Sequence, residues 1–385
     1  MKPIQLDRAS CTGCHACVSK CPRECISMQR DDLGFLYPVI DSDRCISCGI
    51  CMKVCEEVKQ VPRTEERKIY AAKHNSLDVR KKSASGGAFT ALSNAILQDG
   101  GVVVGARYFE DMRVGHDFAR NEAELSLLRG SKYTYSLCGK DIFEKTKGYL
   151  ESGVAVLFSG TPCQVSAFKN YLGSDYENLI TVDILCHGIA APKLYEDFVS
   201  RLSERNGAVG YIDFRYSADG NWHIPRTQVL FKNGKKKSGD FENSYFRMFE
   251  DDYCLRESCY ACGFARFDRV SDLTLGDFWG IEGTHAEFDS PHGVSVVVAS
   301  TEKGRRLLQS ASGEMELLEC TERDCTHDQL NGLKPGGRNL NFVSDYRTYG
   351  FDFVHKKYTL TPLPIRMREK LYRIKLIKKL RDLIK

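Results

Sequence analysis

The sequence predicts an α+β protein with a small cysteine-rich N-terminal domain and a larger, mixed α/β domain behind it. Three observations favour this fold class. Cysteines are concentrated in the first 55 residues, where they recur with one spacing. A charged stretch with little periodicity follows. From residue 84 onward, short apolar runs alternate with segments of helical periodicity, which is typical of strands joined by helical crossovers.

The N-terminal domain contains one cysteine pattern twice, the second copy 34 positions after the first. The spacing C-x2-C-x2-C-x3-C is that of two-cluster ferredoxins, in which the fourth cysteine of each run binds the other cluster. Structural zinc is the alternative, but zinc sites usually use two separated cysteine pairs. We therefore predict two 4Fe-4S clusters, one held by Cys11, Cys14, Cys17 and Cys55, the other by Cys45, Cys48, Cys51 and Cys21. Pro22 follows the first run, whereas Glu56 replaces the expected proline after the second.

Composition limits the classes of function. With 42% hydrophobic and 28% charged residues, the chain of 385 residues is an ordinary globular protein. Its formal charge of +4 omits the thiolates that would bind clusters, so no nucleic-acid partner is expected. No stretch resembles a signal peptide or is long enough to cross a bilayer. Seventeen cysteines without a leader favour a reducing compartment, and we expect the cytoplasm.

We divide the chain into four parts. Residues 1–60 form the two-cluster domain, 61–83 a linker, 84–360 the main domain with its parts 84–155 and 156–340, and 361–385 a tail helix. Strands are expected at 68–73, 102–108, 154–158, 180–185, 211–216, 227–231, 273–276 and 294–299, and helices at 88–98, after 161 through 171, and at 193–205. Asn233-Gly234 is a hairpin-turn signal. The alternation predicts a largely parallel sheet.

Four later cysteines have suggestive positions. Cys163 stands in the first turn of a predicted helix, just past a buried strand, and Cys186 ends the next strand. Ligands in open α/β sheets bind at the carboxyl ends of strands. Cys259-x2-Cys262 adds a pair with metal-binding spacing, so these cysteines are candidates for a third cluster. Two alternatives stay open: ordinary buried cysteines, or a reactive Cys163 thiol with His187 as its base. We expect structural roles for Cys138, Cys254, Cys320 and Cys325. Cys254, five positions before Cys259, nevertheless offers a fifth thiol, so one ligand choice stays open.

Several short motifs then occur in one order, and together they resemble the beta subunit of coenzyme F420 (deazaflavin) hydrogenases and dehydrogenases. The resemblance covers roughly residues 84–340, and the two-cluster domain in front makes the chain similar to the electron-input subunit of the dehydrogenase. It implies a mixed α/β domain that binds FAD and one further 4Fe-4S cluster and exchanges hydride with the reduced deazaflavin. The motifs are SGG at 85–87, GSKY at 130–133, GTPCQ at 160–164, CHG at 186–188, SCYAC at 258–262 and DLTLGDFWG at 272–280.

Neither G-x-G-x-x-G after a strand nor a P-loop occurs, so the phosphates of FAD need another site. Ser85, Gly86 and Gly87 open a predicted helix, whose free N–H groups favour anions. A plain serine N-cap is the alternative. Gly130, Ser131, Lys132 and Tyr133 offer a cation, a hydroxyl and a ring for a pyrophosphate or isoalloxazine wall, or else form an ordinary loop. Asp277 and Trp279 are further candidates near the cofactor, and no catalytic residue is predicted.

The expected function is that of an iron–sulfur flavoprotein oxidoreductase. A hydride carries two electrons and a cluster passes one, so a flavin belongs between them. The expected partners are a hydride-carrying small molecule, such as reduced coenzyme F420, and a redox partner protein or subunit. The alternative is a non-catalytic electron-relay subunit of a larger complex, whose flavin site has decayed and which serves a partner enzyme. The family resemblance also allows a link to surface-polysaccharide synthesis.

The C-terminal segment 365–385 is basic and has an apolar stripe at helical spacing. Such a helix suits a peripheral contact with an anionic membrane. Docking on the protein itself or on a partner subunit is the alternative that we favour.

Overall fold

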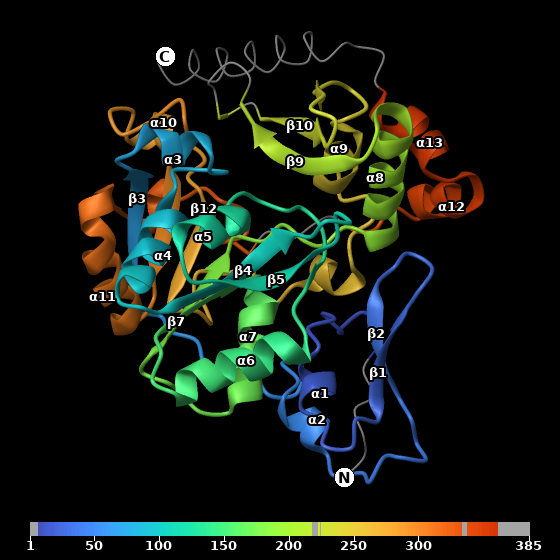
Figure 1. Cartoon of the computed structure of the whole chain (residues 1–385), viewed down its shortest axis with the longest axis horizontal. Coiled ribbons are helices and arrows are strands. Elements are labelled where there is room, and N and C mark those ends of the chain that lie inside the picture. Colours follow the sequence, from blue (N-terminus) through green and yellow to red (C-terminus); the bar gives the residue numbers. More distant parts are fainter. Residues whose placement is uncertain (1–6, 218–221, 224, 333–336, 361–385) are drawn as a thin grey trace.

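The structure, a computed structural model, describes residues 7–217, 222–223, 225–332 and 337–360 (Figure 1). The predicted tail helix lies outside these residues. None of the helices in the described ranges is both long and apolar enough to cross a membrane.

The N-terminal domain folds as two short helices and a hairpin, shown in blue in Figure 1. They are α1 (Ala16–Ser19), β1 (Ile26–Arg30), β2 (Leu36–Ile40) and α2 (Ile50–Lys53). Residues His15 and Gly49 precede the two helices at equivalent positions of the repeat, and both have left-handed φ values, 65° and 74°. The backbone thus makes the same turn in each copy, between its second and third cysteines. The two copies of the repeat therefore fold alike around their cysteines.

A nine-stranded sheet forms the centre of the larger part, in the order β14-β3-β13-β12-β8-β7-β4-β5-β6. Half of its pairings are parallel, among them β4–β7, β7–β8 and β8–β12. The prediction of a largely parallel sheet is therefore wrong, because β13, β3, β14 and β5 join by antiparallel pairing. The strands are β3 (Lys68–His74), β4 (Val102–Tyr108), β5 (Val114–Ala119), β6 (Ser136–Leu137), β7 (Val156–Gly160), β8 (Leu179–Ile184), β12 (Leu273–Asp277), β13 (Ser295–Ala299) and β14 (Met315–Cys320).

One strand comes from the predicted linker. β3 pairs with β13 on one side and with β14 on the other, so it is an interior strand. Its residues Ile69, Ala71 and Ala72 are buried. Residues 68–74 are therefore part of the sheet, although the charged sequence around them is typical of a connector.

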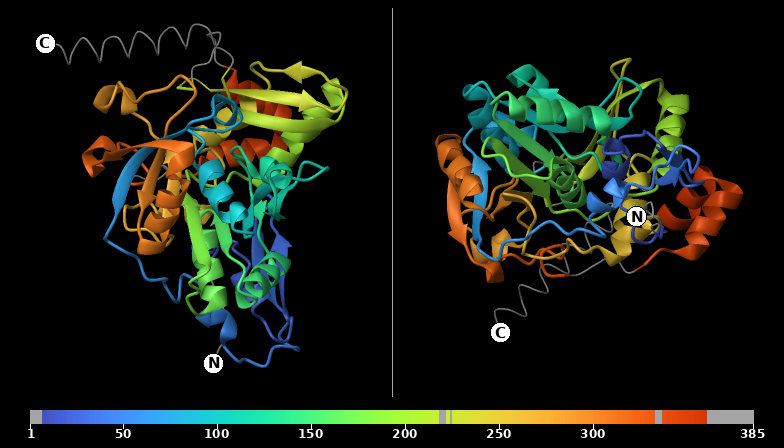
Figure 2. Two further views of the ribbon diagram at one scale, coloured as in Figure 1. Left: turned by 60° about the vertical axis from the view of Figure 1, so that its left-hand side comes forward. Right: turned by 90° about the horizontal axis from the view of Figure 1, so that it is seen from below.

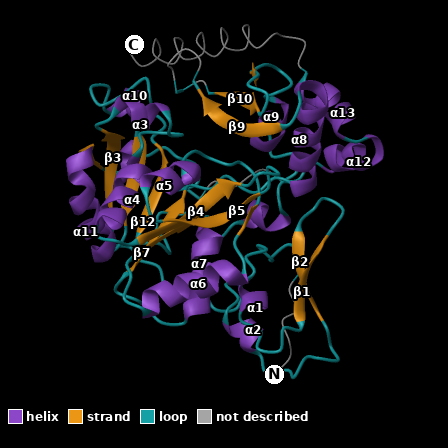
Figure 3. Cartoon of the chain, viewed as in Figure 1, coloured by secondary structure: helices purple, strands orange, loops and turns teal. Residues whose placement is uncertain are grey.

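Helices cover both faces of the sheet (Figures 2 and 3). α4 (Ala88–Gln98), α5 (Glu122–Leu128) and α11 (Glu302–Ser310) share one apolar core with Leu157 and Val297. α6 (Lys140–Glu151) and α7 (Pro162–Leu172) pack on the other face, where Phe158 of β7 stacks on Phe168 at 4.3 Å. The remaining short helices of this part are α3 (Leu77–Lys81), α10 (Ile281–Thr284), η1 (Glu257–Ala261), η2 (Ala311–Glu314) and η3 (Glu322–Asp324).

A second sheet and its helices complete the molecule. β9 (Val209–Tyr216) and β10 (Arg226–Phe231) are antiparallel, and the predicted turn at Gly234 leads into β11 (Lys236–Lys237). These strands share a core with Leu33 and Phe35, so the N-terminal domain is packed against this part. The helices here are α8 (Pro192–Asn206), α9 (Ser244–Glu250), α12 (Leu340–Tyr349), α13 (Phe351–Val354) and the π-helical η4 (His355–Thr359).

Candidate iron–sulfur and cofactor sites

The first predicted cysteine group lines one pocket of the N-terminal domain. Cys11, Cys14 and Cys17 come from the first run, and Cys55 comes from the end of the second. Burial raises the pKa of Cys55 to about 12, and the neighbouring Cys14 and Cys11 thiols add to this shift. The fourth cysteine of the second run thus lies with the first run, as the crossed pattern requires.

The second group lines another pocket with one additional thiol. Cys21, Cys45, Cys48 and Cys51 lie around it, and so does Cys25. Cys25 Sγ lies 3.4 Å from Cys21 Sγ. Burial and the neighbouring Cys21 and Cys45 thiols raise the pKa of Cys25 to about 11. The spacing of the repeat includes no fifth cysteine, so only the fold reveals Cys25.

The third group is assembled at one edge of the large sheet. β7 and β8 are parallel neighbours, and Cys163 and Cys186 follow their carboxyl ends. Cys259 lies in η1, and Cys262 follows directly after it. Burial raises the pKa of Cys163 to about 12, and Cys262 and Cys259 contribute. Burial raises the pKa of Cys186 well above its usual value, and its neighbours Cys259, Cys163 and Cys262 contribute.

These three groups suit 4Fe-4S clusters chemically. Each offers four sulfur ligands, the number that a cubane cluster needs. Burial without a cation keeps the thiols protonated, as the raised pKa values of Cys55, Cys163 and Cys259 indicate. Iron would supply the positive charge that lets such buried thiols ionise.

The alternative of a thiol–imidazole pair has no geometric support. Nε2 of His187 lies 2.6 Å from Asp252 Oδ1, and its Nδ1 lies 3.3 Å from the Gln329 side chain. Cys163 Sγ lies 3.1 Å from Thr161 Oγ1 instead. Both nitrogens of His187 therefore have partners other than Cys163.

The contacts of Glu56 explain why this residue stands where the ferredoxin pattern has a proline. Its buried carboxylate accepts hydrogen bonds from Ser166 Oγ, from Asn170 Nδ2 at 3.3 Å and from the Val61 N–H at 3.2 Å. Ser166 and Asn170 belong to α7, the helix that begins next to Cys163. A proline could not make these bonds, so Glu56 fastens the N-terminal domain to the helix of the third cysteine group.

Two predicted flavin motifs lie along one chain of buried polar side chains. Ser85 Oγ donates to the Val294 carbonyl at 2.8 Å, and Ser85 lies beside Asp277. Asp277 Oδ2 lies 2.8 Å from Arg215 Nη2. Arg215 in turn interacts electrostatically with Tyr133. Ser85 and Tyr133, 48 positions apart in the sequence, are thus linked through Asp277 and Arg215.

Unpaired donors face the same region. Arg215 Nε and Trp222 Nε1 are buried and have no hydrogen-bond partner within the described residues. The rings of Trp222 and Trp279 stack at 4.9 Å, and the Arg215 guanidinium lies 5.0 Å from the centre of the Trp279 ring. A buried donor without a partner is costly. This wall of rings and donors therefore suits a planar ligand that has hydrogen-bond acceptors.

The other predicted flavin residues have mainly structural contacts. Lys132 Nζ donates to the carbonyls of Leu128 and Arg129, at 2.9 and 2.6 Å, where α5 ends. Its ammonium therefore stabilises a helix terminus, and the predicted pyrophosphate contact has no support. Gly86 packs so closely on β3 and β13 that a Cβ would lie 2.3 Å from the Ala72 carbonyl oxygen. Gly87 and Gly130 have φ values of 89° and 79°, and Ser131 hydrogen-bonds Tyr133.

The third cysteine group and the polar chain share one edge of the sheet. β12 is parallel to β8, and Asp277 is its last residue. Cys163, Cys186 and Asp277 thus stand at the carboxyl ends of three adjacent parallel strands, β7, β8 and β12. This edge is where open α/β sheets bind ligands. Asp277 is predicted from its motif, whereas Arg215 lies in no motif and was not predicted from the sequence.

Comparison with known families matches the same parts of the chain. Residues 154–323 match the family described as the C terminus of the coenzyme F420 hydrogenase/dehydrogenase beta subunit. Residues 69–141 match its N-terminal counterpart. Residues 10–57 match the 4Fe-4S dicluster domain.

Individual relatives match more weakly. One subunit of the H(2):CoB-CoM heterodisulfide,ferredoxin reductase from Methanothermobacter marburgensis is 35% identical over 83 residues, which span 18% of this chain and 13% of that protein. The corresponding M. thermautotrophicus protein is 34% identical over the same length and shares. A chain of the F420-reducing [NiFe] hydrogenase complex from Methanosarcina barkeri is 18% identical, with a TM-score of 0.45 over 77% of this chain and 92% of that one.

Proposed function

The chain belongs to the coenzyme F420 hydrogenase/dehydrogenase beta subunit family of oxidoreductases and carries a 4Fe-4S dicluster domain at its N-terminus, and from this premise we propose that it is an iron–sulfur flavoprotein. It transfers electrons between a hydride carrier and iron–sulfur acceptors. FAD and three 4Fe-4S clusters are its cofactors. Reduced coenzyme F420, or a donor like it, is the proposed hydride carrier, and a redox protein or subunit is the proposed partner.

The arrangement of thiols supports the number of clusters. Cys11, Cys14, Cys17 and Cys55 hold the first, Cys21, Cys45, Cys48 and Cys51 the second, and Cys163, Cys186, Cys259 and Cys262 the third. Cys14 is a neighbour of Cys163, so the first and third groups are adjacent. The single observation that carries the proposal is the spatial series of three thiol groups, which extends from the sheet edge into the N-terminal domain.

The sheet edge supports the flavin. Arg215 Nε and Trp222 Nε1 supply donors that have no partner among the described residues, and the Trp279 ring lies beside both side chains. Asp277, the last residue of β12, holds the Arg215 guanidinium, and Ser85 lies beside Asp277. When bound, a flavin accepts an electron pair and releases single electrons, which is the conversion needed between hydride and clusters.

Anaerobic purification followed by flavin extraction tests the proposal. The full chain is denatured, and released FAD is quantified by fluorescence beside iron and acid-labile sulfide. We expect about one FAD and roughly 12 iron atoms per chain, four for each cluster. Iron without FAD, after attempted reconstitution with FAD, would favour the electron-relay subunit instead.

A further inference from the structure

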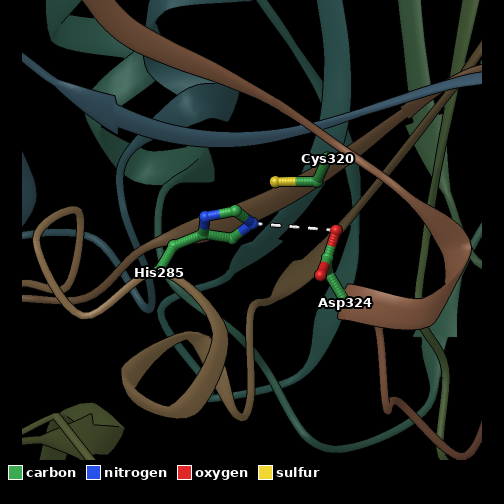
Figure 4. A group of neighbouring side chains, drawn as sticks. All are labelled: His285, Cys320 and Asp324. Atoms are coloured by element: carbon green, nitrogen blue, oxygen red, sulfur yellow. Dashed lines mark ion pairs between the residues drawn. The ribbon is translucent and has the colours of Figure 1, made fainter.

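Three metal-binding side chains meet at a place apart from the three thiol groups. It is also apart from the wall formed by Arg215, Trp222 and Trp279, here called the flavin wall. His285 follows α10, Cys320 ends β14 and Asp324 ends η3 (Figure 4). One ligand atom from each lies within 4.8 Å of the other two. Figure 4 shows the three side chains grouped together, His285 on one segment and Cys320 and Asp324 on another.

His285 has an unsatisfied nitrogen at this point. Its Nε2 is buried and has no hydrogen-bond partner among the residues that the structure describes. Asp324 Oδ2 lies 3.7 Å away, which is too long for a hydrogen bond. Two ligand atoms on a tetrahedral zinc ion, each about 2.0–2.1 Å from it, lie roughly 3.4 Å apart. The separation therefore fits two ligands of one ion with a small contraction.

Hydrogen bonds from Thr321 already orient the carboxylate of Asp324. Asp324 Oδ2 accepts hydrogen bonds from the Thr321 N–H at 2.7 Å and from Thr321 Oγ1 at 2.8 Å. A carboxylate has about four lone-pair sites, so these bonds leave capacity for a cation. Outer hydrogen bonds of this kind hold metal ligands in position.

We propose that His285, Cys320 and Asp324 bind one Zn²⁺ ion. Nitrogen and sulfur donors favour zinc over calcium or magnesium, which prefer oxygen ligands. Zinc would bond to the Cys320 sulfur, and the thiol proton would pass to water. The fourth position takes a water molecule or Cys325, which is buried directly after Asp324. Cys320, and Cys325 where it binds, thereby gain a role beyond the structural one expected from sequence.

A zinc ion here would cross-link two segments next to the flavin wall. Trp279 lies just before α10, and His285 follows this helix. Thr326 Oγ1 donates to the Trp279 carbonyl at 3.3 Å, so the segment after η3 already contacts this loop. Zinc would join the same two segments more strongly and limit the movement of Trp279.

Metal analysis and X-ray absorption of the full, cluster-loaded chain test the site. After dialysis against zinc and desalting, we expect about one zinc per chain in addition to iron. The zinc edge should report one sulfur near 2.3 Å and nitrogen or oxygen near 2.0–2.1 Å, or two sulfurs where Cys325 binds. An all-sulfur shell would mean zinc in a cluster site and would overturn the proposal.

Variants separate zinc loss from misfolding. Asp324→Asn keeps an acceptor for Thr321 but removes the charge, and Cys320→Ser removes the sulfur. Both should lose bound zinc while keeping the wild-type iron content. His292→Gln, on a neighbouring loop outside the triad, should keep both metals. If wild-type protein binds no zinc, or the triad variants keep it, His285 and Asp324 form only an ion pair.

Discussion

Arg256 Nε donates a hydrogen bond to the main-chain carbonyl of Cys11 at 2.6 Å. Its Nη2 donates to the Leu36 carbonyl at 2.8 Å and lies 3.7 Å from Cys11 Sγ. The guanidinium also lies over the Tyr37 ring at 4.4 Å. Arg256 is only 1% exposed and stands three positions before Cys259. A buried positive charge therefore joins the loop of the third cysteine group to the first group.

Removal of this charge should lower the reduction potential of the first cluster. A reduced cluster carries more negative charge, which a nearby guanidinium stabilises. We expect Arg256→Met to lower the potential by on the order of 50–100 mV, and Arg256→Lys to lower it less. Redox titration followed by electron paramagnetic resonance measures the shift. An unchanged potential in protein with full iron content would contradict this role.

Substitution of the fourth cysteine of either run should damage the cluster held mainly by the other run, and the two effects should differ in size. Cys55→Ser should damage the cluster of the first run, whereas loss of Cys21 should damage that of the second. Because Cys25 Sγ lies 3.4 Å from Cys21 Sγ, Cys25 can replace Cys21 as a ligand. We therefore expect full loss of the second cluster only in Cys21→Ser/Cys25→Ser, as judged by iron content and Mössbauer spectra. Damage confined to each cysteine's own run would refute the crossed assignment.

The third cluster is tested by Cys163→Ser. This change should remove roughly four of about 12 iron atoms and disconnect flavin from the N-terminal clusters, while hydride still reduces the flavin. Cys254→Ser is the matched control, since Cys254 lies in an apolar core. The full chain is the right protein to use, because truncation at residue 84 would remove the interior strand β3. Equal iron contents in the two variants would show that Cys163 is not a ligand.

Substitution of Arg215 should weaken FAD binding more than the same substitution of Arg107. Arg215→Gln removes a charged donor from the flavin wall, and we expect FAD affinity to fall about tenfold to a hundredfold. Arg215→Lys should recover part of the loss. Arg107, which pairs with Asp117 at 3.0 Å, provides the control Arg107→Gln. Equilibrium titration of FAD into apo-flavin protein measures the effect, and equal affinities in the two Gln variants would exclude Arg215 from the site.

His116 should make the protein less stable in acid. Burial lowers the pKa of His116 from 6.5 to about 4. Between these pH values the unfolded chain binds a proton that the folded chain does not, so stability decreases as the pH falls through this window. From pH 7 to 5 the loss is about 2 kcal/mol.

His116→Gln isolates that contribution. The imidazole Nε2 lies 2.9 Å from the Ser159 carbonyl oxygen, and Nδ1 lies 3.0 Å from Ser136 Oγ. A glutamine amide can keep both bonds without titrating. Urea midpoints at pH 7 and 5 should therefore differ less in the variant than in the wild type. Identical pH dependence would assign the acid sensitivity to other groups.

The sequence by itself determined the cysteine groups of the N-terminal domain and many elements of the main domain. The repeat encodes ligands within short loops, where spacing alone limits which sulfurs can reach one cluster. Buried strands such as β4 and helices such as α4 followed from local apolar patterns. These features depend on residues that are close in the chain.

Only the tertiary structure decided the contacts between distant segments. It placed β3 inside the sheet and brought Arg256 to Cys11. It made half of the strand pairings antiparallel, where a largely parallel sheet was predicted. It also brought His285 to Asp324 and Arg215 to Asp277. Strand register and packing between elements set these distances, and local sequence patterns carry no record of which elements become neighbours. The predicted ligands could thus be read from spacing, whereas the charges that surround them depend on the fold.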